Sequence, residues 1–116
     1  MSTLDENTTH QLSIELIDRD SVASRMAGAT TLGLHKSRID GHLYRAPKPD
    51  KELEELYSDY CLASNLAYAA LRTRSGFFST GPDEYKVTQA MSAVRHCYEK
   101  VKRRYHHLKE FGYIQR

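Results

Sequence analysis

The side chains best suited to chemistry in this chain are six histidines and two cysteines. Their spacing matches no metal site: the sequence has no Cys-x-x-Cys, no His-Glu-x-x-His and no two histidines four residues apart. His106 and His107 are adjacent, so on a helix they point about 100° apart. His35 and His42 flank Gly41 without a third ligand nearby. We therefore expect no metal and no cofactor.

Nucleophilic and acid–base catalysis find equally little support. Cys61 and Cys97 fall on or beside apolar stripes, where a thiolate is disfavoured. The sequence contains neither Gly-x-Ser-x-Gly nor a glycine-rich phosphate loop. The acidic cluster Glu52, Glu54 and Glu55 stands at a predicted helix start, where carboxylates suit the helix dipole. We expect no catalytic residue, no enzymatic activity and no small-molecule substrate.

Basic side chains are concentrated in the last part of the chain. Residues 84–116 carry a net charge of +5, whereas residues 1–50 and 51–83 carry −1 and −2. The basic side chains that could contact a polyanion are Arg95, Lys100, Lys102, Arg103, Arg104, His107 and Lys109. Phosphates bound by such residues release counterions, which makes binding salt-dependent. The sequence predicts contact with nucleic acid or an acidic protein surface, and a merely solvated face is the alternative.

Two long helices must position these residues. The first begins at Pro49 or Asp50 and ends before Gly76, and the second spans about 83–111. In the second, apolar residues follow a 4-3 spacing that is typical of a helix packed along a neighbour: Val87, Met91, Val94, Tyr98, Val101, Tyr105 and Leu108. The short connection favours antiparallel packing.

The predicted hairpin has an internal register. With the turn near Ser79, residue i faces residue 158 − i, which places Glu54 and Glu55 near Arg104 and Arg103. The same rule sets Cys61 beside Cys97, and packed helix axes lie about 8–10 Å apart. We expect two neighbouring buried thiols rather than a disulfide.

The first of these helices has an unusually wide apolar arc. One stripe comprises Leu53, Leu56, Tyr60, Ala63, Ala67 and Ala70, and a second comprises Leu62, Leu66 and Ala69. Such an arc should be covered on two sides. We expect the first half of the chain to cover one side, and a second copy or a protein partner to cover the other.

The first half is less regular. We expect a polar arm over residues 1–11 and a small subdomain over 12–49, followed by the helical hairpin over 50–116. Residues 12–16 alternate like a short strand, Asp18 or Asp20 could cap a short helix ending at Gly28, and a second short helix spans about 31–39. The fold class is therefore mainly all-α, with a small N-terminal part before the long hairpin.

The segment Asp20-Ser-Val22-Ala23-Ser-Arg-Met26-Ala-Gly28, together with residues 34–39, Gly41 and Leu43-Tyr-Arg-Ala-Pro, resembles the small winged helix–turn–helix of excisionases and MerR-type regulators. In such proteins a second helix enters the major groove and a following strand contacts phosphates. The resemblance implies that the DNA-reading residues are Thr30, Thr31, His35, Lys36 and Arg38, with Arg45 and Lys48 on the wing.

Three functions follow as expectations. The first is a non-enzymatic accessory protein that acts within a complex through its hairpin, such as a phage or mobile-element inhibitor or adaptor. The second is a winged helix–turn–helix regulator that dimerises through the hairpin, and the third is a structural assembly protein without nucleic-acid contact. We expect a cytoplasmic protein, because no apolar run approaches the roughly 18 residues of a membrane span and the first ten residues resemble no secretory signal.

Overall fold

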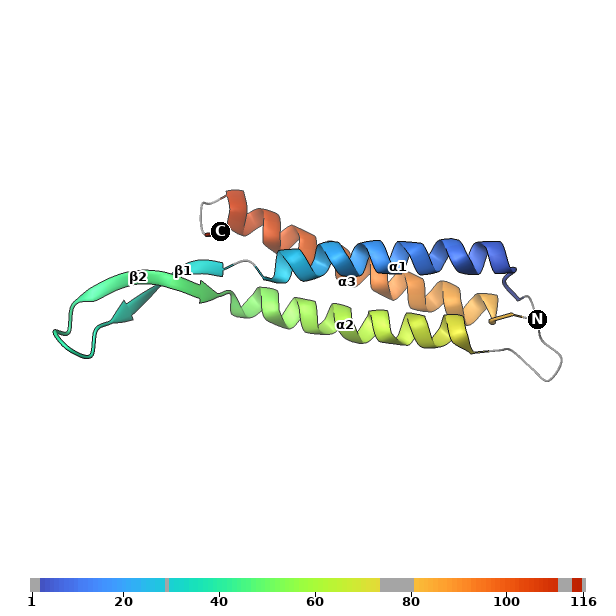
Figure 1. Ribbon diagram of the computed structural model, residues 1–116, viewed down its shortest axis with the longest axis horizontal. Coiled ribbons are helices and arrows are strands. Elements are labelled where there is room, and N and C mark those ends of the chain that lie inside the picture. The colour runs from blue at the N-terminus through green and yellow to red at the C-terminus, as the bar shows by residue number, and fades with distance from the viewer. Residues whose placement is uncertain (1–2, 29, 74–80, 111–113, 116) are drawn as a thin grey trace.

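The computed structural model describes residues 3–28, 30–73, 81–110 and 114–115, with the backbone only for 30–35, 45–48 and 114–115. Its elements are, in chain order, α1 (Glu6–Ala27), β1 (Thr30–Lys36), β2 (Leu43–Pro49), α2 (Lys51–Arg72), α3 (Glu84–Glu110) and β3 (Ile114–Gln115). The three helices lie side by side, and β1 and β2 extend beyond them where α1 ends and α2 begins, so the whole molecule is a rod of 70 × 25 × 16 Å (Figure 1).

The predicted helical hairpin is confirmed. α2 and α3 pack along their length in opposite directions (Figure 1). Asp50 caps α2 by accepting a hydrogen bond from the Leu53 amide at 2.9 Å, and Asp83 accepts one from the Lys86 amide at 3.1 Å. The apolar seam of α3 forms much of the core, with five residues buried: Val87, Met91, Val94, Val101 and Leu108.

The N-terminal part differs from its prediction, because residues 6–27 form one long helix. The expected strand over 12–16 and the polar arm over 1–11 are wrong from Glu6 onward: Asp5 caps α1 by accepting a hydrogen bond from the Thr8 amide at 2.7 Å. Before the helix, the Leu4 amide donates to the Pro82 carbonyl at 3.0 Å, so this end is tied to the start of α3. α1 buries Leu16 completely against the hairpin.

The short helix predicted over residues 31–39 is also wrong. Residues 30–36 form strand β1, which pairs antiparallel with β2 from Thr30 opposite Pro49 to Lys36 opposite Leu43. β3 pairs with the other side of β1, giving the order β2-β1-β3. β-branched Thr30 and Thr31 favour a strand, and Gly33 disfavours a helix. The prolines of β2 are tolerated because β2 is an edge strand.

A polar cluster fixes α1 to α2. The carboxylate of Asp20 accepts hydrogen bonds from the Tyr60 hydroxyl at 2.7 Å, the Ser64 hydroxyl at 2.8 Å and the Tyr68 hydroxyl at 3.0 Å. Burial and the hydrogen bond to Asp20 raise the pKa of Tyr68 to about 12, and the same two causes raise that of Tyr60. Asp20 therefore does not cap a short helix: it lies inside α1 and joins two helices.

Candidate polyanion-binding surface

Two of the seven basic residues singled out on α3 are held in ion pairs between helices. The Arg95 guanidinium donates to both Glu15 oxygens, at 2.8 and 2.9 Å, and so ties α3 to α1. The Arg104 guanidinium donates to both Asp50 oxygens, at 2.9 and 3.0 Å, and lies 3.0 Å from a Glu52 oxygen. These hydrogen bonds lower the pKa of Glu15 and of Asp50. Both arginines therefore stabilise the bundle.

The remaining five of these seven residues are exposed: Lys100, Lys102, Arg103, His107 and Lys109. Within the described part of the chain, the three lysines and Arg103 make no ion pair with a carboxylate. They lie around the second half of α3, the half that approaches the projecting strands (Figure 1). This half of the helix is the part of the predicted surface that is open to a ligand.

The strands bring a second basic segment to the same end of the rod. Residues 28–49 carry four basic and one acidic side chain, and Lys36 and Arg38 are exposed. Strand β3, which follows α3, pairs with the base of β1 at Thr30 and Thr31. The two basic segments, far apart in sequence, therefore meet at one end (Figure 1).

The DNA-reading arrangement implied by the helix–turn–helix resemblance is not present. The segment expected to form the reading helix, which includes Thr30, Thr31 and His35, is strand β1. Arg45 lies on β2, opposite Leu34 of β1. The side chains of these residues lie outside the described part of the structure. Only Lys36 and Arg38 of the proposed readers are described as exposed side chains.

The projecting tip has apolar residues that the sequence reasoning did not single out. Ile39 is 98% exposed in the turn between β1 and β2, and Leu43 and Tyr44 are largely exposed at the start of β2. Gly41 closes the turn with φ of 74°, a conformation that glycine adopts without strain. This hairpin could have been predicted from a pattern in the sequence: two extended runs separated by a short turn, Ser37 to Gly41, that contains glycine.

Both cysteines are free, as expected, but they are half-buried and not buried. Cys61 lines a cavity of about 340 Å³ between α1 and α2 that also contacts Asp20 and Tyr57. Cys97 packs against the core from α3. Arg104 pairs with Asp50 and Glu52 instead of lying near Glu54 as the predicted rule placed it. No group of three or more His, Cys, Asp or Glu side chains in the described ranges could hold a metal ion.

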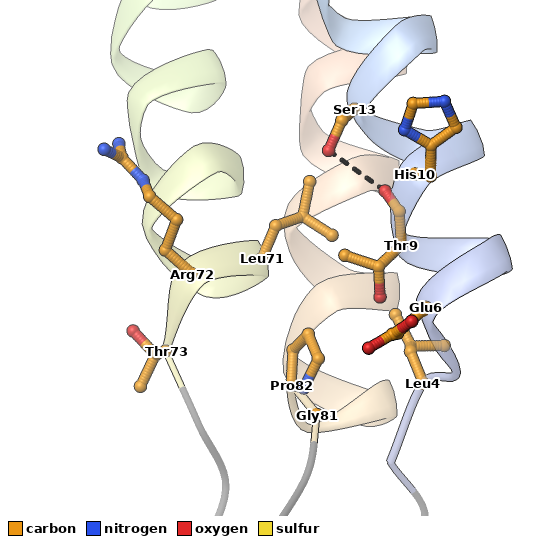
Figure 2. Close-up of a pocket in the computed structure, with 10 residues that line it drawn as sticks. All are labelled: Leu4, Glu6, Thr9, His10, Ser13, Leu71, Arg72, Thr73, Gly81 and Pro82. Carbon is orange, nitrogen blue, oxygen red and sulfur yellow. Dashed lines mark hydrogen bonds between the residues drawn. The ribbon is translucent and has the colours of Figure 1, made fainter.

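A larger cavity of about 430 Å³ lies at the opposite end of the bundle, between α1, the end of α2 and the start of α3 (Figure 2). Leu4, Leu71 and Pro82 supply apolar walls, and His10 and Arg72 are among its polar residues. This cavity is remote from the basic end, and it adjoins the ends of two described segments. We assign it no ligand.

Across the described residues, the structure contains no helix that is both long and apolar enough to cross a membrane. Comparisons with protein-family models, with curated proteins and with solved structures return no match for this chain.

Proposed function

We propose that this protein is a non-enzymatic nucleic-acid-binding protein that contacts a duplex with its basic end. One observation carries the proposal: the pairing of β3 with β1 joins the basic strand pair to the basic half of α3. The two segments have net charges of +3 over residues 28–49 and +5 over 95–116. Acidic side chains at the start of α2 neutralise part of this charge, chiefly through Asp50 and Glu52 on Arg104.

The shape of the basic end favours a nucleic-acid duplex over an acidic protein. A two-stranded ribbon fits the major groove of B-form DNA, which is about 12 Å wide. In this proposed pose the lysines of α3, at the same end of the rod, would contact phosphates, which position a protein on DNA without reading its sequence. Lys36 and Arg38 stand at the distal part of the ribbon, where a groove would receive them.

The experiment is a titration of a fluorescent duplex with the full chain, followed by anisotropy at several salt concentrations. We expect the logarithm of the binding constant to fall linearly with the logarithm of salt. Two double variants, Lys36→Glu with Arg38→Glu and Lys102→Glu with Lys109→Glu, should each weaken binding by at least about tenfold, since each reverses two phosphate contacts. Arg72→Glu, an exposed charge reversal at the opposite end of α2, is the matched control and should have little effect.

Two results would contradict the proposal. Wild-type protein that binds neither a DNA nor an RNA duplex at low salt has no such function. If it binds polyglutamate instead, the partner is an acidic protein surface. Equal binding by wild type and both double variants would mean that the basic end is not the contact surface.

A further inference from the structure

The α2–α3 pair has two long grooves, and α1 fills only one of them. The opposite groove is open in the described part of the molecule and encloses about 330 Å³. It is lined by small and apolar residues with two polar ones at the edge: Ala63, Leu66, Ala70, Lys86, Gln89, Ala90 and Ala93. The second apolar stripe of α2, which comprises Leu62, Leu66 and Ala69, was predicted to pack against a second copy or a protein partner, and it lies on this side.

Two exposed leucines of α2 lie on this side. Leu66 lines the groove and is 68% exposed, and Leu62, one turn before it on a neighbouring face of the helix, is 62% exposed. Clustered exposure of large apolar side chains on one face marks an interaction site more often than scattered single residues do. The face therefore has a large exposed side chain, Leu66, next to a groove lined by alanines.

We propose that a second copy of this chain covers this groove, with the two α2–α3 pairs antiparallel about a twofold axis. Within one copy, Leu66 and Ala70 of α2 line the same cavity as Ala90 and Lys86 of α3, which places the two pairs at about the same levels along the groove. An axis passing between Ala63 and Leu66 then brings Leu66 of each copy onto the alanines of the other. A twofold interface is self-complementary in this way.

The charges around the groove favour the antiparallel arrangement. Asp59 lies on the same face of α2 as Leu66, about two turns before it, and is exposed. Lys86 is exposed about one turn beyond the level of Leu66. The twofold axis brings Lys86 of one copy to Asp59 of the other at both rims of the interface. A parallel arrangement would instead oppose Lys86 to Lys86, which repel.

The test is the mass of the full chain in solution, measured by sedimentation velocity over a concentration series. We expect a dimer, and we expect Leu66→Glu to weaken dimerisation at least about tenfold because it buries a carboxylate against alanine. Ile17→Glu is the matched control: Ile17 is 58% exposed on α1, outside the groove, and its substitution should leave the dimer intact. Circular dichroism checks that both variants remain helical.

A charge exchange tests the orientation. Asp59→Lys and Lys86→Glu should each weaken the dimer, and the two together should restore it, because the exchanged charges again meet across the interface. A wild-type chain that stays monomeric up to about 100 µM would overturn the proposal. So would a Leu66→Glu variant that dimerises like wild type, and a double charge variant no better than the single ones would overturn the antiparallel pairing. None of these results depends on nucleic-acid binding.

Discussion

At the scale of single residues, Asp20 is the polar centre of the bundle. Three hydroxyl groups of α2 donate to it, and two of them belong to buried residues, Tyr60 and Ser64. Asp20→Ala would leave these hydroxyls without their protein acceptor in a partly buried interface. We expect the free energy of unfolding to fall by about 2–4 kcal/mol, measured by urea denaturation.

A neighbouring aspartate provides the control for this substitution. Asp18 is also on α1 but is exposed, so Asp18→Ala should change the free energy of unfolding by no more than about 0.5 kcal/mol. Equal effects of the two substitutions would show that the hydrogen bonds of Asp20 contribute nothing beyond those of a surface carboxylate.

Asp20 also explains why α1 was not predicted at its full length. Its position lies between buried Leu16 and buried Ala23, on the face that packs against the hairpin. A charged residue there interrupts the apolar period from which a helix is recognised. Its partners lie 40 to 48 residues away in the chain, so nothing in the local sequence indicates that the carboxylate is satisfied.

The Asp50–Arg104 pair predicts an acid-sensitive contribution to stability. The hydrogen bonds from Arg104 hold the pKa of Asp50 below its ordinary 3.8, so the unfolded chain takes up a proton first as pH falls. The contribution is thus complete well above pH 3.8 and is lost as pH falls below it. Asp50→Asn keeps a capping side chain but loses the charge, and should cost about 1 kcal/mol at neutral pH.

The measurement is urea unfolding of wild type and Asp50→Asn from neutral pH down to about pH 2. The difference between the two proteins should shrink at the acid end, where the wild-type carboxyl is also uncharged. Glu54→Gln, at an exposed site in the same turn, should show no comparable difference. A gap that stays constant over the whole range would mean that the charge of Asp50 is not the cause.

At the scale of elements, the sequence predicted helices well where the packing partner is a neighbouring segment with a regular apolar period. The seam from Val87 to Leu108 is such a case, and α3 begins and ends within one residue of its expected bounds. β1 is the opposite case. Its partners are β2 and the two residues of β3, and the second pairing joins residues more than 80 positions apart.

In the candidate surface too, some features could be predicted from the local sequence and others depend on contacts between distant segments. The basic half of α3 could be read from composition, because charge needs no knowledge of the fold. Arg95 and Arg104 form ion pairs with residues of other elements, and these pairs could not be predicted without knowing which helices are neighbours. In particular, the sequence did not indicate that α1 lies beside α3. That the ribbon carrying Lys36 and Arg38 stands at the same end of the rod as the α3 lysines depends on strand pairing across the whole chain.

At the scale of the whole molecule, charge and apolar surface are separated along the rod. The basic strands and the second half of α3 occupy one end, and the open α2–α3 groove lies toward the other, along Leu66 and Ala90. One end is thus suited to a polyanion and the other to a second copy. An antiparallel dimer built on that groove would carry its two basic ends at opposite extremities.

A protein with this geometry should join two nucleic-acid duplexes. We expect energy transfer between donor-labelled and acceptor-labelled duplexes when wild-type protein is added, passing through a maximum and falling in excess protein, where each duplex is saturated separately. Leu66→Glu should bind a single labelled duplex, because its basic end is intact, yet produce little transfer. Energy transfer by Leu66→Glu equal to that of wild type would mean that bridging does not depend on this groove, whereas loss of duplex binding by the same variant would place Leu66 in the nucleic-acid contact itself.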